Sequence, residues 1–101
     1  MNDVPIPSPY RSTPVFDEHT LPAALRREHR TKQGVWGVIR VLHGELKLTF
    51  TESGESRMLL PGSPGFLLPD QPHLVEPTGP MRMQVDFYHE CPNQNLQGTT
   101  K

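Results

Sequence analysis

The sequence predicts an all-β domain, a sandwich or barrel of roughly eight short strands. Turn signals recur about every ten residues along the chain, which is the usual spacing of strands in such folds. Several stretches between the turns alternate apolar and polar residues, as half-buried strands do. The 12 prolines and 8 glycines supply many turns but fall short of the composition of a disordered chain. A length of 101 residues suits one domain with one core, covering residues 1–101.

Charge and composition exclude several classes of partner. A formal net charge of -1 offers no basic surface for nucleic acid or an anionic membrane, so we expect neither partner. The longest apolar runs are far shorter than a membrane span, and the first residues lack the features of a secretory signal. We therefore expect a cytoplasmic protein. The single cysteine, Cys91, cannot form an internal disulfide, so any metal site must use histidine and carboxylate ligands.

The first third of the chain carries the weakest strand signals. Residues 1–14 contain four prolines among small polar residues and are expected to form an irregular arm. Residues 23–30 are good helix formers without a β-branched side chain, so local propensity favours a helix. A strand over the same residues would instead pair with residues 35–42 through a turn at 31–34 and place His29 beside that turn.

The remaining elements follow from clearer patterns. Residues 35–42 are nearly all apolar and rich in β-branched side chains, which indicates a buried strand. Residues 45–50 and 81–88 alternate apolar with polar side chains and are predicted as half-buried strands. Residues 65–68 form a short apolar strand before a proline-rich turn. The polar tail, residues 92–101, is expected to be frayed.

His73 is the most informative single residue, because it stands directly after the turn Pro69-Asp70-Gln71-Pro72. A histidine held past a rigid turn, at the mouth of a core strand, is well placed for metal binding or proton transfer. The alternative is a histidine that caps the strand end and binds backbone. His29 could supply a second imidazole from a neighbouring strand; its alternative is an exposed side chain in a polar run.

Two carboxylates complete the set of candidate ligands. Asp86 lies near the end of the strand over residues 81–88, and it could be a third ligand, a partner that orients a histidine, or half of an outward salt bridge. Glu76 follows His73 by three residues, so strand alternation places it on the opposite face unless the strand bulges. His43 precedes a hairpin glycine and is expected to be an exposed turn residue.

The chain resembles a known family in several segments taken together. Residues 65–73 resemble the second motif of the cupin β-barrels, and residues 41–46 resemble the glycine-centred hairpin that closes the first motif. Residues 10–88 are similar to the small single-domain cupins related to the tellurite-resistance protein B N-terminal domain, including the YeaR-type proteins. The shared pattern is carried by Arg11-Ser12-Thr13-Pro14, Leu21-Pro22-Ala23, His29 with Gly34-Val35-Trp36, Val41-Leu42-His43-Gly44, Pro69 with His73 and Glu76, and Val85-Asp86-Phe87-Tyr88.

This resemblance implies a cupin-type double-stranded β-helix, or jelly-roll, barrel that forms a homodimer. It favours the strand over residues 23–30. It also implies a divalent metal, Zn, Ni or Fe, at the barrel mouth, and no nucleotide or flavin. The candidate ligands for this metal are His29, His73, Asp86 and Glu76. The chain departs from the usual first motif, because only one histidine precedes the turn and residues 35–37 are Val-Trp-Gly.

The predicted function is that of a small cupin that binds a metal or an unidentified small molecule, linked by resemblance to tellurite resistance and stress. One alternative is a metal-dependent enzyme of the dioxygenase or isomerase type, which requires Asp86 or Glu76 to point inward. The other is a metal-free structural or dimerisation barrel whose interior is closed by apolar side chains.

Overall fold

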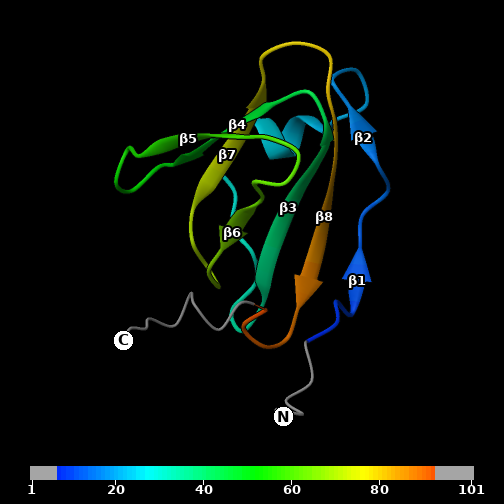
Figure 1. Ribbon diagram of the computed structural model, residues 1–101. Coiled ribbons are helices and arrows are strands. Elements are labelled where there is room, and N and C mark those ends of the chain that lie inside the picture. The colour runs from blue at the N-terminus through cyan, green and yellow to red at the C-terminus, as the bar shows by residue number, and fades with distance from the viewer. Residues whose placement is uncertain (1–6, 93–101) are drawn as a thin grey trace.

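The computed structural model describes residues 7–92, which form two antiparallel β-sheets around one core (Figure 1). The strands of the first sheet are β1 (Arg11–Ser12), β2 (Phe16–Asp17), β3 (Trp36–His43), β6 (Gly65–Leu67) and β8 (Arg82–Tyr88). Those of the second sheet are β4 (Leu46–Phe50), β5 (Ser56–Leu59) and β7 (His73–Pro77). The all-β prediction is confirmed. No ladder of paired strands joins the two sheets within the described residues, so they do not form a closed barrel.

The two central strands set which side chains face the core. In the first sheet β3 lies between β8 and β6, with Ile39 opposite Val85 and Gly65. In the second sheet β4 lies between β5 and β7, and Leu48 faces the core with no exposed surface. The alternation of strand side chains sends every second residue inward, and both sheets contribute to one apolar cluster. Its members are Leu21, Ile39, Val41, Leu46, Leu48, Phe50, Leu59, Leu67, Val75, Met81, Met83 and Val85.

Four predicted strands agree with the structure to within one residue at each end: β3, β4, β6 and β8. Their signals are local, since each shows a buried run or an apolar–polar alternation over its whole length. The hairpin between β3 and β4 turns at Gly44, whose φ of 75° favours glycine.

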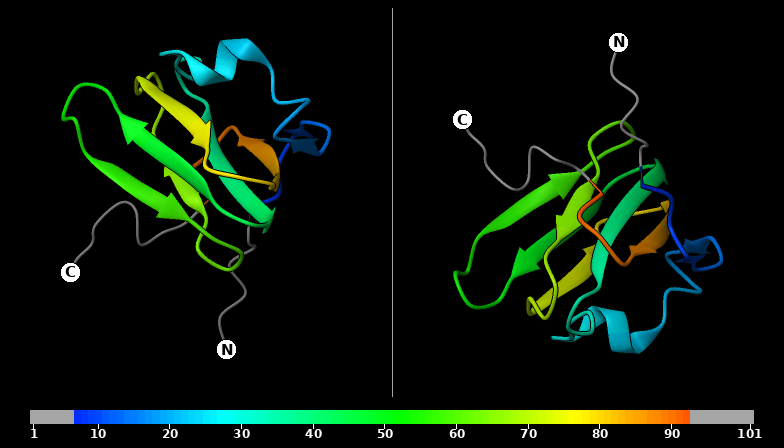
Figure 2. Two further views of the ribbon diagram at one scale, coloured as in Figure 1. Left: turned by 90° about the horizontal axis from the view of Figure 1, so that it is seen from above. Right: turned by 90° about the horizontal axis from the view of Figure 1, so that it is seen from below.

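The strand predicted over residues 23–30 is wrong. Residues Ala23–Arg26 form a single turn of 3-10 helix, η1, in which the backbone N–H of Leu25 donates to the carbonyl of Pro22 at 3.0 Å. Local helix propensity therefore outweighs the family resemblance at this point. Only His29 makes a strand-like pairing, and its partner is His73 of β7 rather than the strand at 35–42. Figure 2 shows η1 beside β7 at one edge of the two sheets.

The stretch predicted as an irregular arm includes a short strand. The backbone of β1 pairs with β8, and flanking bonds join the N–H of Tyr10 to Phe87 and the N–H of Thr13 to Val85. Residues 1–6 of the arm and 93–101 of the predicted tail lie outside the described residues. Across the residues that the structure describes, no helix combines the length and the apolar character that a membrane span requires.

Candidate functional site

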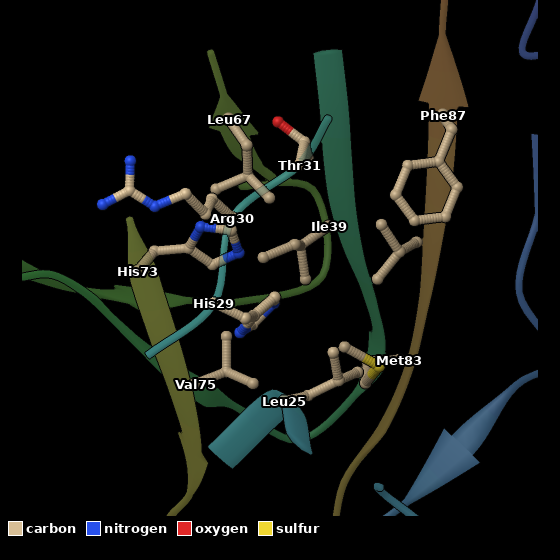
Figure 3. A pocket seen from close by; sticks show the side chains of 11 residues that line it. Leu25, His29, Arg30, Thr31, Ile39, Leu67, His73, Val75, Met83 and Phe87 are labelled. Atoms are coloured by element: carbon tan, nitrogen blue, oxygen red, sulfur yellow. The ribbon is translucent and has the colours of Figure 1, made fainter. Parts of the chain in front are cut away.

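A cavity of about 130 Å³ lies between the two sheets at the end covered by η1 and the segment that follows it (Figure 3). Strands of both sheets contribute its walls, and most of the side chains are aliphatic or aromatic. The lining residues are Leu25, His29, Arg30, Thr31, Ile39, Leu67, His73, Val75, Met83, Val85 and Phe87. The two histidines predicted as ligands therefore face the same cavity.

His73 is the first residue of β7 and is 1% exposed. The turn before it is held by its own bonds, since the N–H of Leu68 donates to the side-chain oxygen of Gln71 at 2.9 Å and the N–H of Gln71 donates to the carbonyl of Leu68 at 3.2 Å. The ring nitrogen Nδ1 of His73 lies 2.8 Å from the carbonyl oxygen of Gln71. The proline-rich turn thus fixes both the backbone and the ring.

His29 is tied to His73 through the backbone. Each residue donates its N–H to the carbonyl of the other at 2.9 Å, so the two form an isolated antiparallel bridge. The rings meet edge to face, with centroids 4.1 Å apart and planes at 61°. Nδ1 of His29 lies 3.0 Å from the carbonyl oxygen of Arg27. His29 is partly exposed and stands at the mouth, while His73 is buried behind it.

The two backbone contacts fix where the ring protons are. A carbonyl oxygen has no proton to give, so Nδ1 of each histidine must be the donor. In a neutral ring the lone pair then belongs to Nε2. Both rings point into the cavity, where Nε2 of His73 faces toward Ile39 (Figure 3). The site therefore offers hydrogen-bond acceptors in apolar surroundings.

Burial determines the charge of His73. Removal from water lowers the pKa of His73 from 6.5 to about 4; the Gln71 carbonyl opposes this shift and the neighbouring His29 adds to it. The ring is consequently neutral at physiological pH. A base with so low a pKa is poorly matched to general base catalysis near neutrality.

The rim of the cavity is closed by bonds between two loops. The hydroxyl of Thr31 donates to the carbonyl of Leu68 at 3.2 Å and accepts from the N–H of Asp70 at 3.1 Å. The guanidinium of Arg30 pairs with the carboxylate of Asp70 at 3.4 Å, and both side chains are about half exposed. These polar groups therefore satisfy one another at the mouth.

Asp86 does not join the histidines. It lies on the opposite face of β8 from the cavity-lining Val85, and its carboxylate accepts from Arg40 Nε and from the Ser12 hydroxyl, both at 2.7 Å. Burial alone would raise the pKa of the Asp86 carboxyl, but the bonds from Arg40 and Ser12 and the charge of Arg40 hold the pKa below its ordinary value. Of the three readings of Asp86, the structure agrees with the salt bridge, although the carboxylate is buried.

Glu76 is exposed on β7, opposite Lys47 of β4 and on the other face of the strand from His73. The strand does not bulge, so alternation separates Glu76 from the site. Across residues 7–92 no group of three or more His, Cys, Asp or Glu side chains is close enough to hold a metal ion. The donor set is two imidazoles, short of the three protein ligands that catalytic zinc sites use, so these residues do not fit a resident divalent metal. The predicted set of four ligands is not assembled.

Sequence reasoning missed several parts of the site. The segment after η1 folds back over the sheets and adds Leu25, Arg30 and Thr31 to the cavity lining. No apolar–polar pattern in the sequence predicts this path. Arg40 was missed as the partner of Asp86. The available signal was that Arg40 is a single charged residue in an otherwise apolar stretch; the pairing of Val38 with Asp86 then places Arg40 on the same face of the sheet as Asp86.

Comparison with known proteins places these features in a family. A family model described as the TehB-like domain matches residues 11–85. The "Probable S-adenosyl-L-methionine-dependent methyltransferase TehB" of Haemophilus influenzae is 40% identical over 47 residues, which are 46% of this chain and 16% of that protein. The protein of the same name from strain 10810 is 38% identical over 47 residues.

Two solved structures share the fold. The crystal structure of TehB from Haemophilus influenzae matches with a TM-score of 0.71 and 32% identity, over 79% of this chain and 30% of that one. A crystal structure of a protein from E. coli (strain K12) matches with a TM-score of 0.73 over 87% of this chain and 96% of that one; at 23% identity it supports the fold alone. The chain spans less than a third of the length of the TehB proteins it matches.

Proposed function

The chain belongs to the TehB-like domain family, and on that premise we propose that it is a binding domain that takes a compact, largely apolar small molecule between its two sheets. The observation that carries the proposal is the cavity itself, in which the ring nitrogens Nε2 of two histidines face apolar walls. A ligand site of this kind, apolar with a few convergent polar groups, is the usual form of a small-molecule pocket.

The size of the cavity limits the ligand. Its 130 Å³ is close to the roughly 150 Å³ of an apolar protein cavity that holds benzene. S-adenosylmethionine combines an adenosine with a methionine and is much larger, so the methyltransferase activity in the relatives' name is not part of the proposal. We propose instead an accessory binding role, linked to tellurite resistance by the family relation.

The enzyme alternative has less support from this geometry. A metal-dependent reaction would need more ligands than His29 and His73, and the two carboxylates expected to provide them lie elsewhere. The purely structural alternative predicts a filled interior, whereas the space beside His73 is open. Of the three functions, small-molecule binding agrees best with the geometry of the cavity.

We further propose a cupin-type fold, a homodimer and a cytoplasmic location. A jelly-roll of the cupin type is supported by two antiparallel sheets that enclose a ligand-sized space at one end. The homodimer and the cytoplasmic location remain predictions from family resemblance and composition.

The proposal is tested by titrating the protein with toluene and following the methyl groups of Ile39 and Val75 by NMR. We expect saturable shifts confined to cavity residues. The variant Val75→Phe fills the cavity and should abolish them. Leu74→Phe is the matched control, because Leu74 lies on the opposite face of the same strand and should bind like the parent. Absence of saturable binding in the parent would refute the proposal.

A further inference from the structure

The polar groups around the cavity are not equally available to a ligand. The Thr31 hydroxyl already donates to Leu68 and accepts from Asp70, and the Arg30 guanidinium is paired with Asp70. The Nδ1 protons of both histidines are committed to backbone carbonyls. Among the lining residues, what remains for a ligand is the Nε2 lone pair of each histidine, and the other walls are apolar.

A site with acceptors and apolar walls discriminates by charge. An anion in the cavity would lose its water for little return, because the cation among the lining residues, Arg30, is half exposed at the rim and already pairs its charge with Asp70. An uncharged hydroxyl, by contrast, can donate to Nε2 and keep its hydrogen bond. An uncharged aromatic ring can pack against the apolar walls.

His73 is the better acceptor of the two. His73 is 1% exposed, so bulk water competes less for its Nε2 than for that of His29, which is partly exposed at the mouth. The low pKa of His73, about 4, is consistent with this role, because the ring keeps its lone pair at neutral pH.

We infer that the ligand of this cavity is an uncharged, phenol-sized molecule whose hydroxyl group donates a hydrogen bond to Nε2 of His73. The inference rests on the proposed function and narrows it to a ligand class. No covalent step is involved. The hydroxyl is the feature that separates such ligands from pure hydrocarbons of the same shape.

Phenol and toluene provide the test, because they have nearly the same shape and differ in the hydroxyl. The critical variant is His73→Asn, whose shorter amide reaches the position of Nδ1 and can still donate to the Gln71 carbonyl but does not reach the position of Nε2. A second variant, His29→Asn, tests the histidine at the mouth, and the matched control is His43→Asn, the same substitution at an exposed histidine that does not line the cavity. Affinities for both probes are measured by NMR titration, and folding of each variant is checked by thermal melting.

In the parent, phenol should bind at least as tightly as toluene, although water holds phenol more strongly. In His73→Asn the affinity ratio of phenol to toluene should fall roughly 10- to 100-fold, since the buried hydroxyl loses its partner. In His29→Asn the ratio should fall less than about threefold, because water already competes there. Toluene binding should survive in all three variants, and His43→Asn should keep the affinity ratio of the parent.

The outcomes separate the two proposals. Saturable toluene binding with a ratio unchanged by His73→Asn overturns the ligand class but leaves the binding domain. Binding of neither probe to the parent overturns both. If His73→Asn does not fold, the ¹⁵N resonance of His73 Nε2 in the parent decides: it should move with phenol and not with toluene, and an unmoved resonance at saturating phenol overturns the inference.

Discussion

At the level of single residues, the site depends on a buried histidine ring that has one nitrogen hydrogen-bonded to the backbone and the other open to the cavity. His73 donates from Nδ1 to the carbonyl of Gln71 and is almost without exposed surface. Proteins commonly fix a functional histidine in this way, because the bond at one nitrogen sets the tautomer and the orientation of the other. The role of His73 follows from this bond and from the apolar walls near it.

The burial of His73 makes stability depend on pH. The folded protein holds the pKa of His73 at about 4 against 6.5 for the ordinary group, so as the pH falls from 6.5 toward 4 the unfolded chain takes up a proton that the folded chain does not. The free energy of unfolding should therefore fall across that window, by an upper figure of roughly 3 kcal/mol from this group. Above pH 6.5 the group adds no pH dependence.

Urea unfolding at neutral pH and near pH 4.5 measures this loss. His73→Asn carries no titrating ring, so the drop in its free energy of unfolding over the same interval should be smaller than that of the parent. Equal drops in parent and variant would mean that His73 is not the group responsible.

Asp86 shows what residue-scale reasoning could and could not predict. The sequence marks it as a carboxylate near the end of a core strand, and that strand alternates so that Val85 and Phe87 share the other face. That alternation favours a position away from the cavity, where Arg40 and Ser12 bind it. The place of Asp86 near the strand end did not identify its partners, because the face of the strand on which a side chain lies decides which groups it meets.

At the scale of elements, the sequence predicts the strands well, but it does not predict the segment after η1 that covers the cavity. Local sequence patterns are enough to predict four strands, because each has its own run of apolar residues or apolar–polar alternation; these are β3, β4, β6 and β8. The segment after η1 has no such pattern. Its position depends on the bridge between His29 and His73, a contact between residues far apart in the chain that no local signal predicts.

The β3–β4 hairpin provides a test at this scale. Gly44 has a φ of 75°, and a side-chain carbon there would overlap the carbonyl oxygen of Pro80. Gly44→Ala should therefore lower the free energy of unfolding by roughly 3 kcal/mol or more, combining backbone strain with overpacking. Denaturant unfolding monitored by circular dichroism measures the change.

Gly54→Ala is the matched control for this hairpin. Its φ of 77° imposes a similar strain, but nothing lies within 4 Å of the added carbon. We expect a loss of only about 1–2 kcal/mol. A loss as large as that of Gly44→Ala would contradict the proposed role of the contact with Pro80.

At the scale of the whole molecule, two sheets meet around one core and leave one end open beside the histidines. The all-β class and the place of His73 directly after its turn could be predicted from the sequence, because turns, alternation and the proline-rich loop are local. The partners of Asp86 and the lining of the cavity could not, because the register between β3 and β8 and the path of the loop over the cavity are set by packing across the molecule.

The same arrangement predicts how the molecule responds to metal removal. Because two imidazoles are the available donors among the described residues, dialysis of tag-free protein against a chelator should leave the melting temperature unchanged. Elemental analysis accompanies the melting curves. A stoichiometric metal that is lost in His29→Asn, together with a lower melting temperature, would show that ligands other than those identified complete a metal site.

The most direct test of the central claim is a long-range ¹H–¹⁵N NMR spectrum of the histidine rings in the ligand-free protein, recorded from neutral pH down to pH 4. The account predicts that His73 stays neutral with its proton on Nδ1 until the pH approaches 4, with Nε2 unprotonated. A proton on Nε2, or a ring that is charged at neutral pH, would contradict it, because the cavity would then offer a donor where the account requires an acceptor.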